Sequence, residues 1–428
     1  MKRILKKIVV TILTWEARLA LRKYKPKVVA ISGNVGKTGT KDAIFTALSA
    51  YHRARKSEKS FNSEVGVPLT ILGLPNAWSS LHGWFENILE GAYVVLFKHD
   101  YPEWLVLECG ADRPGDLRAL HWVRPHVVVY TRFPDVPVHV EYFDSPEAVI
   151  EEKLELKKAL RAHGTLIVNA DDPKMANLAV EEGQTVLSYG FSEAATVRGG
   201  TPEVRYEDKR PVGMTSAVTF QAEHAELTLD GTLGHHHVYP LLAALAVVVA
   251  EGHGFSASVP SLTGHATPPG RMRVLKGRDG MTLIDDSYNS SPSAVEAGLT
   301  TLGTLKTDGR IVVFLGDMME LGDFSVSAHE AVGTHVAEVA HVFVGVGVRM
   351  RSAVQKAKDA KGRCTRIEAV QNVEEAIALA REILFEGDTV YVKGSQSMRM
   401  EKLSASLLAD PNTAPEFLVR QDTEWKKR

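Results

Sequence analysis

Residues 28–38 read VVAISGNVGKT, an apolar stretch followed by a turn with two glycines and then by Lys37 and Thr38. The apolar stretch predicts a buried strand, and Gly-Lys-Thr predicts the start of a helix. Amide groups at such a helix start can hold anionic oxygens, while Lys37 can neutralise phosphate charge and the Thr38 hydroxyl can bind Mg²⁺. The spacing is GxxGKT, which is shorter than the GxxxxGK[ST] of the general phosphate loop. The alternative to a phosphate-binding loop is therefore an ordinary turn between a strand and a helix.

Short apolar runs of the same kind recur along the chain, each followed by a turn and a helical pattern. They lie at 28–31, 105–107, 127–130 and 166–168, and after the Gly/Pro-rich stretch 264–270 they resume at 283–284, 311–315, 342–344 and 390–392. This alternation predicts an α/β protein with a mostly parallel sheet in each of two domains, the second beginning near residue 266. The more alternating segment 196–232 predicts an antiparallel addition to the first domain.

Length and composition favour a folded protein of two or more domains, because 428 residues exceed one ordinary core and 44% of them are hydrophobic. Fifty basic residues against 52 acidic ones leave a formal charge of -2, which gives no reason to expect nucleic acid as a partner. The two cysteines, Cys109 and Cys364, lack the spacing of a metal site or a disulfide scaffold. A reducing compartment, the cytoplasm, is the natural location.

The first 25 residues predict an amphipathic helix with basic ends. One apolar stripe holds Ile4, Ile8, Ile12, Trp15 and Leu19. The uncharged run from residue 8 to 15 is too short to span a bilayer, and charged residues after it do not fit a signal peptide. Two interpretations stay open: the stripe packs on the protein or a second subunit, or it contacts a membrane surface peripherally.

Two charged side chains occur where their surroundings are apolar. Glu108 follows the strand at 105–107, so its carboxylate is expected at the carboxyl edge of a parallel sheet, where such folds bind ligands. Lys153 shares a helical stripe with Val149, Leu156 and Leu160, in a helix that Ser145 and the following proline predict to begin there. The alternatives are a solvent-facing glutamate and a lysine whose amine reaches the rim of the stripe.

Further motifs then point to one family. SGNVGKTGTK (32–41), NSEVGVPLT (62–70), ECGA (108–111), NADDP (169–173) and GRM (270–272) resemble the Mur ligases, the enzymes that build the peptide stem of peptidoglycan. In the second domain IDDSYN (284–289), GDMMELG (316–322) and KGSQSM (393–398) are similar to its D-alanyl-D-alanine-adding branch. The resemblance covers roughly residues 27–405 and keeps the family's motif order.

The resemblance implies a P-loop-type, mostly parallel ATP-binding domain over 26–265 and a smaller Rossmann-like domain over 266–410. An N-terminal helix (1–25) precedes them, and 411–428 is expected to be a surface tail. The implied activity is an ATP-dependent, ADP-forming joining of a carboxylate and an amine through an acyl-phosphate. D-alanyl-D-alanine would be added to a UDP-MurNAc-tripeptide in peptidoglycan precursor synthesis.

The resemblance also assigns roles to individual residues. ATP binding is assigned to Gly33, Asn34, Val35, Gly36, Lys37, Thr38, Gly39, Asn169, Asp172, Arg271 and Asp286. Two Mg²⁺ ions are assigned to Thr38, Glu108, His139 and a carbamylated Lys153, and catalysis to Lys37, Lys153, His139 and Arg271. Substrate contacts are assigned, more weakly, to Asn62, Tyr288, Asn289, Lys393 and Ser395.

Three departures from the family pattern leave alternatives open. Residues 1–26 occupy the place of a family domain that binds the UDP-sugar. Thr-Arg-Phe (131–133) replaces the family's Thr-Asn-Ile. His-His-Val-Tyr-Pro (236–240) replaces the family's His-Asn-x-x-Asn, which lies near the adenine. The same chemistry on a different or lipid-linked acceptor is therefore one alternative, with a location at the inner face of the membrane. A non-catalytic nucleotide-binding scaffold of cell-wall synthesis is another, and a partner protein is compatible with each.

Overall fold

The computed structural model describes residues 3–57, 64–78, 80–133, 142–175, 178, 180–422 and 425, with side chains from residue 6 onward. The chain forms two compact units. The first contains Met1–Thr201, Ala217–Leu227 and Tyr239–Thr263, and the second contains Pro202–Ser216, Thr228–Val238 and Gly264–Arg428.

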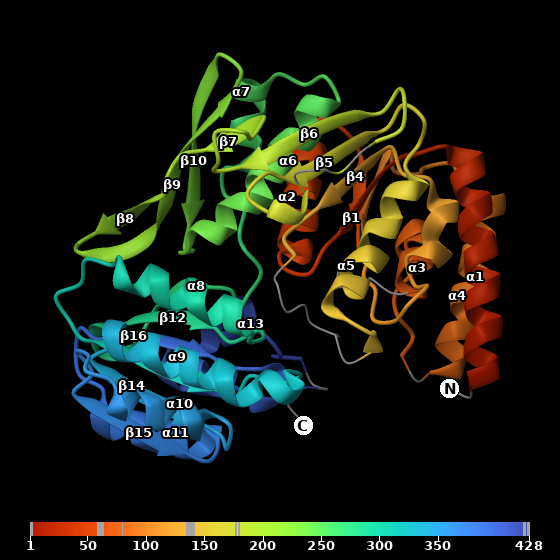
Figure 1. Ribbon diagram of the computed structural model, residues 1–428. Coiled ribbons are helices and arrows are strands. Elements are labelled where there is room, and N and C mark those ends of the chain that lie inside the picture. The colour runs from red at the N-terminus through yellow and green to blue at the C-terminus, as the bar shows by residue number, and fades with distance from the viewer. Residues whose placement is uncertain are drawn as a thin grey trace. The chain divides into compact units, whose positions relative to one another are not determined.

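The first unit is built on one large twisted sheet with the strand order β10-β9-β7-β6-β5-β4-β1-β3-β2 (Figure 1). Its parallel part contains β1 (Lys27–Ser32), β2 (Ala54–Lys56), β3 (Trp104–Glu108), β4 (Val127–Tyr130), β5 (Thr165–Asn169), β6 (Thr185–Gly190) and β7 (Val197–Gly199). Helices cover both faces of the central parallel strands, and the residues of these strands are therefore almost wholly apolar. The predicted strands at 28–31, 105–107, 127–130 and 166–168 are confirmed.

An antiparallel extension completes this sheet. It contains β8 (Glu203–Glu207), β9 (Arg210–Phe220) and β10 (Glu223–Asp230), and both β7 and β8 pair antiparallel with β9. The predicted antiparallel addition is thus present, but its distal part clusters with the second unit. There the Tyr206 hydroxyl accepts a hydrogen bond from the Lys306 amide, and Lys209 pairs with Asp308.

Helices cover both faces of the first sheet. Figure 1 shows α1 (Arg3–Tyr24), α3 (Gly66–Leu72), α4 (Leu81–Leu96) and α5 (Pro146–Leu154) on one side and α2 (Lys37–Ser49) and α6 (Val238–Ala250) on the other. The short helices α7 (Phe255–Ser258), η1 (Arg118–Val123), η3 (Glu155–Ala159), η4 (Pro173–Met175), η5 (His235–His237) and η6 (Val259–Leu262) connect these elements. Within the described residues, no helix is both long and apolar enough to cross a bilayer.

The helix α1 forms as predicted but packs through a different face. Its buried side chains are Val9, Leu13, Glu16, Ala17 and Ala20. Of the predicted stripe, Ile8 and Trp15 are exposed, Ile12 and Leu19 are half-buried, and the Ile4 side chain lies outside the described residues. The buried alanines allow close approach to the neighbouring helices α3 and α4, which explains why this face is the buried one.

The second unit is a smaller doubly covered sheet with the order β11-β12-β16-β13-β14-β15. Its strands are β11 (Arg273–Lys276), β12 (Thr282–Asp286), β13 (Ile311–Gly316), β14 (Val342–Val346), β15 (Arg366–Val370) and β16 (Thr389–Lys393), all parallel except β11. The main helices are α8 (Pro292–Gly303), α9 (Ser325–Val339), α10 (Met350–Asp359), α11 (Val373–Ile383) and α12 (Glu401–Leu407). The predicted fold class, two α/β units on mostly parallel sheets, is confirmed.

The segment after residue 410, expected to be a surface tail, packs on the second unit through part of its length. The segment forms η10 (Pro411–Thr413) and α13 (Ala414–Phe417), and Ala414 and Leu418 are buried in the core of the second unit. Arg420 is largely buried as well, and its guanidinium lies 3.0 Å from the buried Glu401 carboxylate. The segment's charge suggested solvent, but a few well-spaced apolar side chains and one ion pair are enough to hold it on the core.

Candidate functional site

The loop between β1 and α2 has, at two points, a backbone conformation that favours glycine. Gly33 has φ 135°, and a Cβ atom there would lie 2.1 Å from Thr131 Oγ1. Gly36 has φ 89° and caps the start of α2. The amides of Asn34 and Val35 donate hydrogen bonds to the Arg132 carbonyl, so the loop is fixed against the segment after β4.

Lys37, the first residue of α2, extends its side chain back over the loop. Its Nζ lies 2.9 Å from the Gly33 carbonyl and 3.2 Å from the Asn34 carbonyl. A cation is thereby held directly over a glycine turn that opens into a helix N-terminus. Both features attract a polyphosphate, because the helix dipole and the ammonium group favour the same negative charge.

Glu108 lies where the sequence predicts, at the carboxyl end of β3, in register with Ile31 of β1. Its carboxylate is buried: Oε1 accepts a hydrogen bond from the Thr38 hydroxyl at 3.3 Å, and Oε2 has no hydrogen-bond partner. Lys41, whose side chain is also buried, approaches Oε2 to 3.7 Å. A carboxylate and a hydroxyl oxygen side by side next to a phosphate loop form a donor pair suited to a hard divalent cation.

Lys41 is a residue that sequence reasoning missed, although it belongs to the quoted loop motif. It follows Lys37 by four residues and therefore lies one helical turn further along α2. That spacing was the available signal, but only the fold shows that this second lysine faces inward to Glu108.

Lys153 confirms the expected helical pattern. The Ser145 hydroxyl caps the helix by accepting from the Ala148 amide, the helix begins at Pro146, and the whole predicted stripe of Val149, Lys153, Leu156 and Leu160 is buried. Burial and, to a smaller extent, the charge of Lys37 lower the pKa of the Lys153 amine to about 7, while the charge of Asp112 acts in the opposite direction. The charge of Lys37 thus disfavours the Lys153 ammonium, and the neutral form of Lys153 is accessible near pH 7.

The residues after β5 serve local structure in the fold. Asn169 Oδ1 accepts from the Asp171 amide at 2.9 Å, which forms an Asx turn. Asp172 accepts from the Phe133 amide at 2.7 Å and thus fixes the loop after β4. Asp171 holds Tyr239, at a position where the family motif differs, through a 2.8 Å hydrogen bond from the phenol.

A second group of predicted residues meets at the carboxyl ends of β12 and β16 in the second unit. The Lys393 amine lies 2.7 Å from Asp286 Oδ2 and 2.9 Å from the Asn289 carbonyl, and Tyr391 donates to the same carboxylate. Arg271 stacks over the Tyr288 ring at 4.4 Å. The sequence identified these residues except Tyr391, and it did not identify the buried Asp286–Lys393 ion pair.

The remaining predicted residues have other surroundings. Ser395 is buried and accepts a hydrogen bond from the Met319 amide, and Gly39 faces Pro240 of α6. Asn62 and His139 lie outside the described residues. The described part of the chain contains no cluster of three or more His, Cys, Asp or Glu side chains placed for a metal ion.

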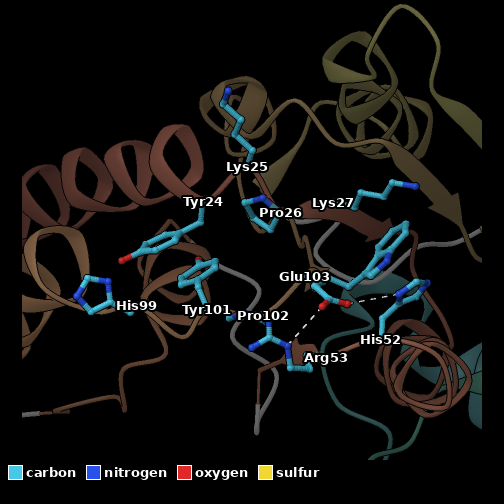
Figure 2. A pocket seen from close by; sticks show the side chains of 11 residues that line it. Tyr24, Lys25, Pro26, Lys27, His52, Arg53, His99, Tyr101, Pro102 and Glu103 are labelled. Carbon is cyan, nitrogen blue, oxygen red and sulfur yellow. Dashed lines mark hydrogen bonds and ion pairs between the residues drawn. The ribbon is translucent and has the colours of Figure 1, made fainter.

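A cavity of about 390 Å³ lies elsewhere, at the amino ends of β1 and β3. Figure 2 shows that Glu103 stands between two basic side chains there, with His52 Nδ1 at 3.5 Å and Arg53 Nε at 3.4 Å. None of the predicted site residues lines this cavity. Because open parallel sheets bind ligands at the carboxyl ends of their strands, the candidate functional site of the first unit contains Lys37, Thr38, Glu108 and Lys153.

These features are those of an α/β protein whose glycine turn, loop lysine and pair of oxygen donors suit a phosphate group and a divalent cation. Comparison with known families is consistent with that class and narrows it. The Mur ligase middle domain matches residues 31–248, and the Mur ligase glutamate ligase domain matches residues 270–396. The chain therefore belongs to the Mur ligase family, and it is a ligase, as the sequence motifs indicated.

Individual relatives share about a quarter of their residues with this chain. The UDP-N-acetylmuramoyl-tripeptide–D-alanyl-D-alanine ligase of Bacillus subtilis is 26% identical over 92% of this chain and 79% of its own length. The enzyme of that name from Mycobacterium tuberculosis (strain H37Rv) is 29% identical over 90% and 73%.

Among solved structures, MurF from Acinetobacter baumannii has a TM-score of 0.75 at 23% identity, covering 94% of this chain and 81% of its own. The Thermotoga maritima MurF ligase in complex with ADP has a TM-score of 0.74 at 22% identity, covering 95% and 84%. At these identities the two structures establish the shared fold.

Proposed function

We propose that the protein is an ATP-dependent ligase that adds D-alanyl-D-alanine to a UDP-MurNAc-tripeptide in peptidoglycan precursor synthesis. The observation that carries the proposal is the grouping of Lys37, Thr38 and Glu108 at the carboxyl edge of the first sheet, with the Lys153 amine close to Lys37. The names of the relatives supply the substrates, since both curated enzymes perform this addition.

The chemistry proceeds in two steps. An acceptor carboxylate oxygen attacks the γ-phosphorus of ATP, the bond from phosphorus to the bridging oxygen breaks, and ADP leaves with the electron pair. The amine nitrogen of the dipeptide then attacks the acyl-phosphate carbonyl and loses a proton, and phosphate leaves as the amide forms. Lys37 neutralises charge on the transferred phosphoryl group, so positioning and electrostatics supply most of the acceleration.

The residues at the loop fit a magnesium ion. Glu108 Oε2 is buried without a hydrogen-bond partner, and the Thr38 hydroxyl lies beside the other carboxylate oxygen, so both can turn to a cation bound with the phosphates. Bound there, Mg²⁺ would offset phosphate charge. The buried neutral amine of Lys153 can add CO₂ with loss of a proton, which would give an anionic carbamate as a ligand for a second Mg²⁺. His139 is proposed as a further ligand on the family resemblance.

In the second unit we propose that Arg271 and Asp286 contact the nucleotide and that Tyr288, Asn289, Lys393 and Ser395 border the amino substrate. The buried pair of Lys393 and Asp286 supports a fixed, preorganised position for these charges. In the first unit Asn169 and Asp172 are proposed to act on the nucleotide side. Their hydrogen bonds to neighbouring amides support a role in shaping the loops that surround it.

The second candidate keeps the chemistry but uses a lipid-linked acceptor at the inner face of the membrane. The exposed apolar side chains of Ile8 and Trp15 on α1 favour it, since a peripheral contact through residues 1–25 would bring the site to such an acceptor.

The test measures ADP release and amide product by mass spectrometry, with ATP, D-alanyl-D-alanine and either UDP-MurNAc-tripeptide or its lipid-linked form. We expect product only when all three substrates are present, and we expect Glu108→Gln to need more Mg²⁺ for the same rate. Product from the lipid-linked form alone would select the second candidate. ATP turnover that no acceptor stimulates would contradict both.

A further inference from the structure

The helices α1 and α4 lie against each other on the outside of the first unit (Figure 1). Lys23 Nζ of α1 donates to the Val95 carbonyl of α4 at 2.7 Å, and the Tyr24 hydroxyl donates to the Val94 carbonyl. Further along, the helices approach so closely that a Cβ atom at Gly91 would meet Glu16. The two helices therefore form one continuous layer.

The inner faces of both helices are buried against the first unit, and their outer faces still expose large apolar side chains to solvent. On α4 the inner face contains Trp84, Gly91 and Val94, which are buried. The outer apolar side chains of the layer are each 50–65% exposed, and they are Ile8, Trp15, Leu81, Phe85, Leu89 and Leu96. We call these six residues the α1/α4 face. Phe85 follows Leu81 by four residues and Leu89 follows Phe85 by four, so they form one stripe along α4.

Exposed apolar side chains are ordinary when scattered, but a row of them at i, i+4 spacing along one helix, as on α4, marks an interaction surface. Helices that lie in a membrane interface combine such a stripe with basic flanks.

The charges beside the α1/α4 face identify the kind of partner. Among the described side chains of α1, the exposed charged ones are all basic, and they are Lys6, Lys7, Arg18, Arg22 and Lys23. The acidic residue of this helix, Glu16, is buried. On α4 the carboxylates Glu86 and Glu90 border the stripe, and Glu86 lies 3.1 Å from His82.

A two-fold contact that sets α1 of one copy against α1 of the other fits this pattern poorly, because it would bring basic side chains against one another. An anionic lipid surface satisfies both features at once. Its headgroups can pair with the basic side chains of α1, of which Lys6 also pairs with Glu64 at 2.9 Å. Its acyl chains receive the aromatic and aliphatic side chains of the face.

We propose that the α1/α4 face docks the protein on an anionic lipid bilayer, with α1 and α4 lying in the plane of the interface. The face includes no residue of the phosphate loop, so docking does not depend on the proposed ligase function. The docking surface extends beyond the first 25 residues, since most of its apolar side chains come from α4.

The experiment is vesicle flotation of the full chain without ATP. One set of vesicles contains phosphatidylcholine alone, and the other contains three parts phosphatidylcholine to one part phosphatidylglycerol. The test variant carries Phe85→Ser and Leu89→Ser. The matched control carries Phe324→Ser and Val326→Ser, which replace similarly exposed side chains in the second unit. Circular dichroism and a thermal melt show that each variant is folded.

We expect the parent and the control to float with the anionic vesicles, more weakly as salt rises, and to bind neutral vesicles poorly. The test variant should bind at least about tenfold more weakly, because each lost apolar side chain weakens partition by roughly that factor. A parent that stays unbound, or a test variant that binds like the control, would overturn the proposal. So would a dimeric parent that becomes monomeric in the test variant without any vesicle binding, since the face would then join two copies.

Discussion

Replacing Lys153 by methionine tests whether the buried amine is kept for catalysis at a cost in stability. Methionine has a similar length and shape but no charge. Burial lowers the Lys153 pKa from 10.5 to about 7, so roughly half of these amines are neutral at pH 7, against about one in 3,000 for a free lysine. The same difference opposes folding, because the unfolded chain accepts the proton more readily than the folded one.

The stability effect follows from proton linkage. A pKa shift of that size corresponds to about 4 kcal/mol at pH 7, an upper limit that applies when neither CO₂ nor nucleotide is bound. Between pH 7 and 10.5 the unfolded chain holds more protons than the folded chain, so the parent gains stability as pH rises through this window. Below pH 7 the cost is constant. Lys153→Met should therefore be more stable than the parent at pH 7, by a margin that narrows toward pH 10.

The assay combines urea unfolding of parent and variant across this pH range with measurement of ligation. Lys153→Met should be stable yet inactive, and Lys153→Arg should also be inactive, because it keeps a cation where an anionic ligand is proposed. Lys153→Ala should be inactive and partly restored by small carboxylic acids that replace the carbamate oxygens.

Two results would refute this reasoning. One is a stability difference between parent and Lys153→Met that does not change with pH, which would mean that the amine titrates as an ordinary solvated lysine. The other is ligation by Lys153→Arg at the parent rate, which would contradict both the proposed carbamate and the proposed second metal ion.

Three further substitutions test other parts of the structure. Lys37→Ala should lower the ligation rate by roughly a hundredfold or more while circular dichroism stays unchanged, since this lysine supplies charge to the reaction; near-normal ligation would remove the loop assignment. Gly33→Ala should abolish nucleotide binding, measured by calorimetry, and destabilise the first unit, because the added Cβ would clash with Thr131. Gly115→Ala is the control: Gly115 also has a positive φ but has open space around it, so this substitution measures the cost of the backbone conformation alone. Equal effects of the two substitutions would contradict the steric argument. Leu418→Ala should cost about 2–4 kcal/mol in urea unfolding, and a loss near zero would restore the segment after 410 to the surface.

The sequence alone was sufficient to predict features that depend on interactions between residues close together in the chain. Glycines that allow a left-handed turn, followed by a lysine at a helix start, specify the turn of the candidate phosphate loop within eleven residues. A serine cap before Pro146 sets the helix start, and the period of the apolar residues then places Lys153 on the buried face.

Tertiary structure decided what depends on the partner that a segment meets. Helix α1 carries two overlapping apolar stripes, and periodicity cannot tell which of them packs; close contact with α3 and α4 selects the one with small residues and leaves Ile8 and Trp15 outside. The contact of Lys41 with Glu108 likewise joins residues that are 67 positions apart. Such pairs form only when strand order brings distant segments to one edge of the sheet, and no local pattern encodes that order.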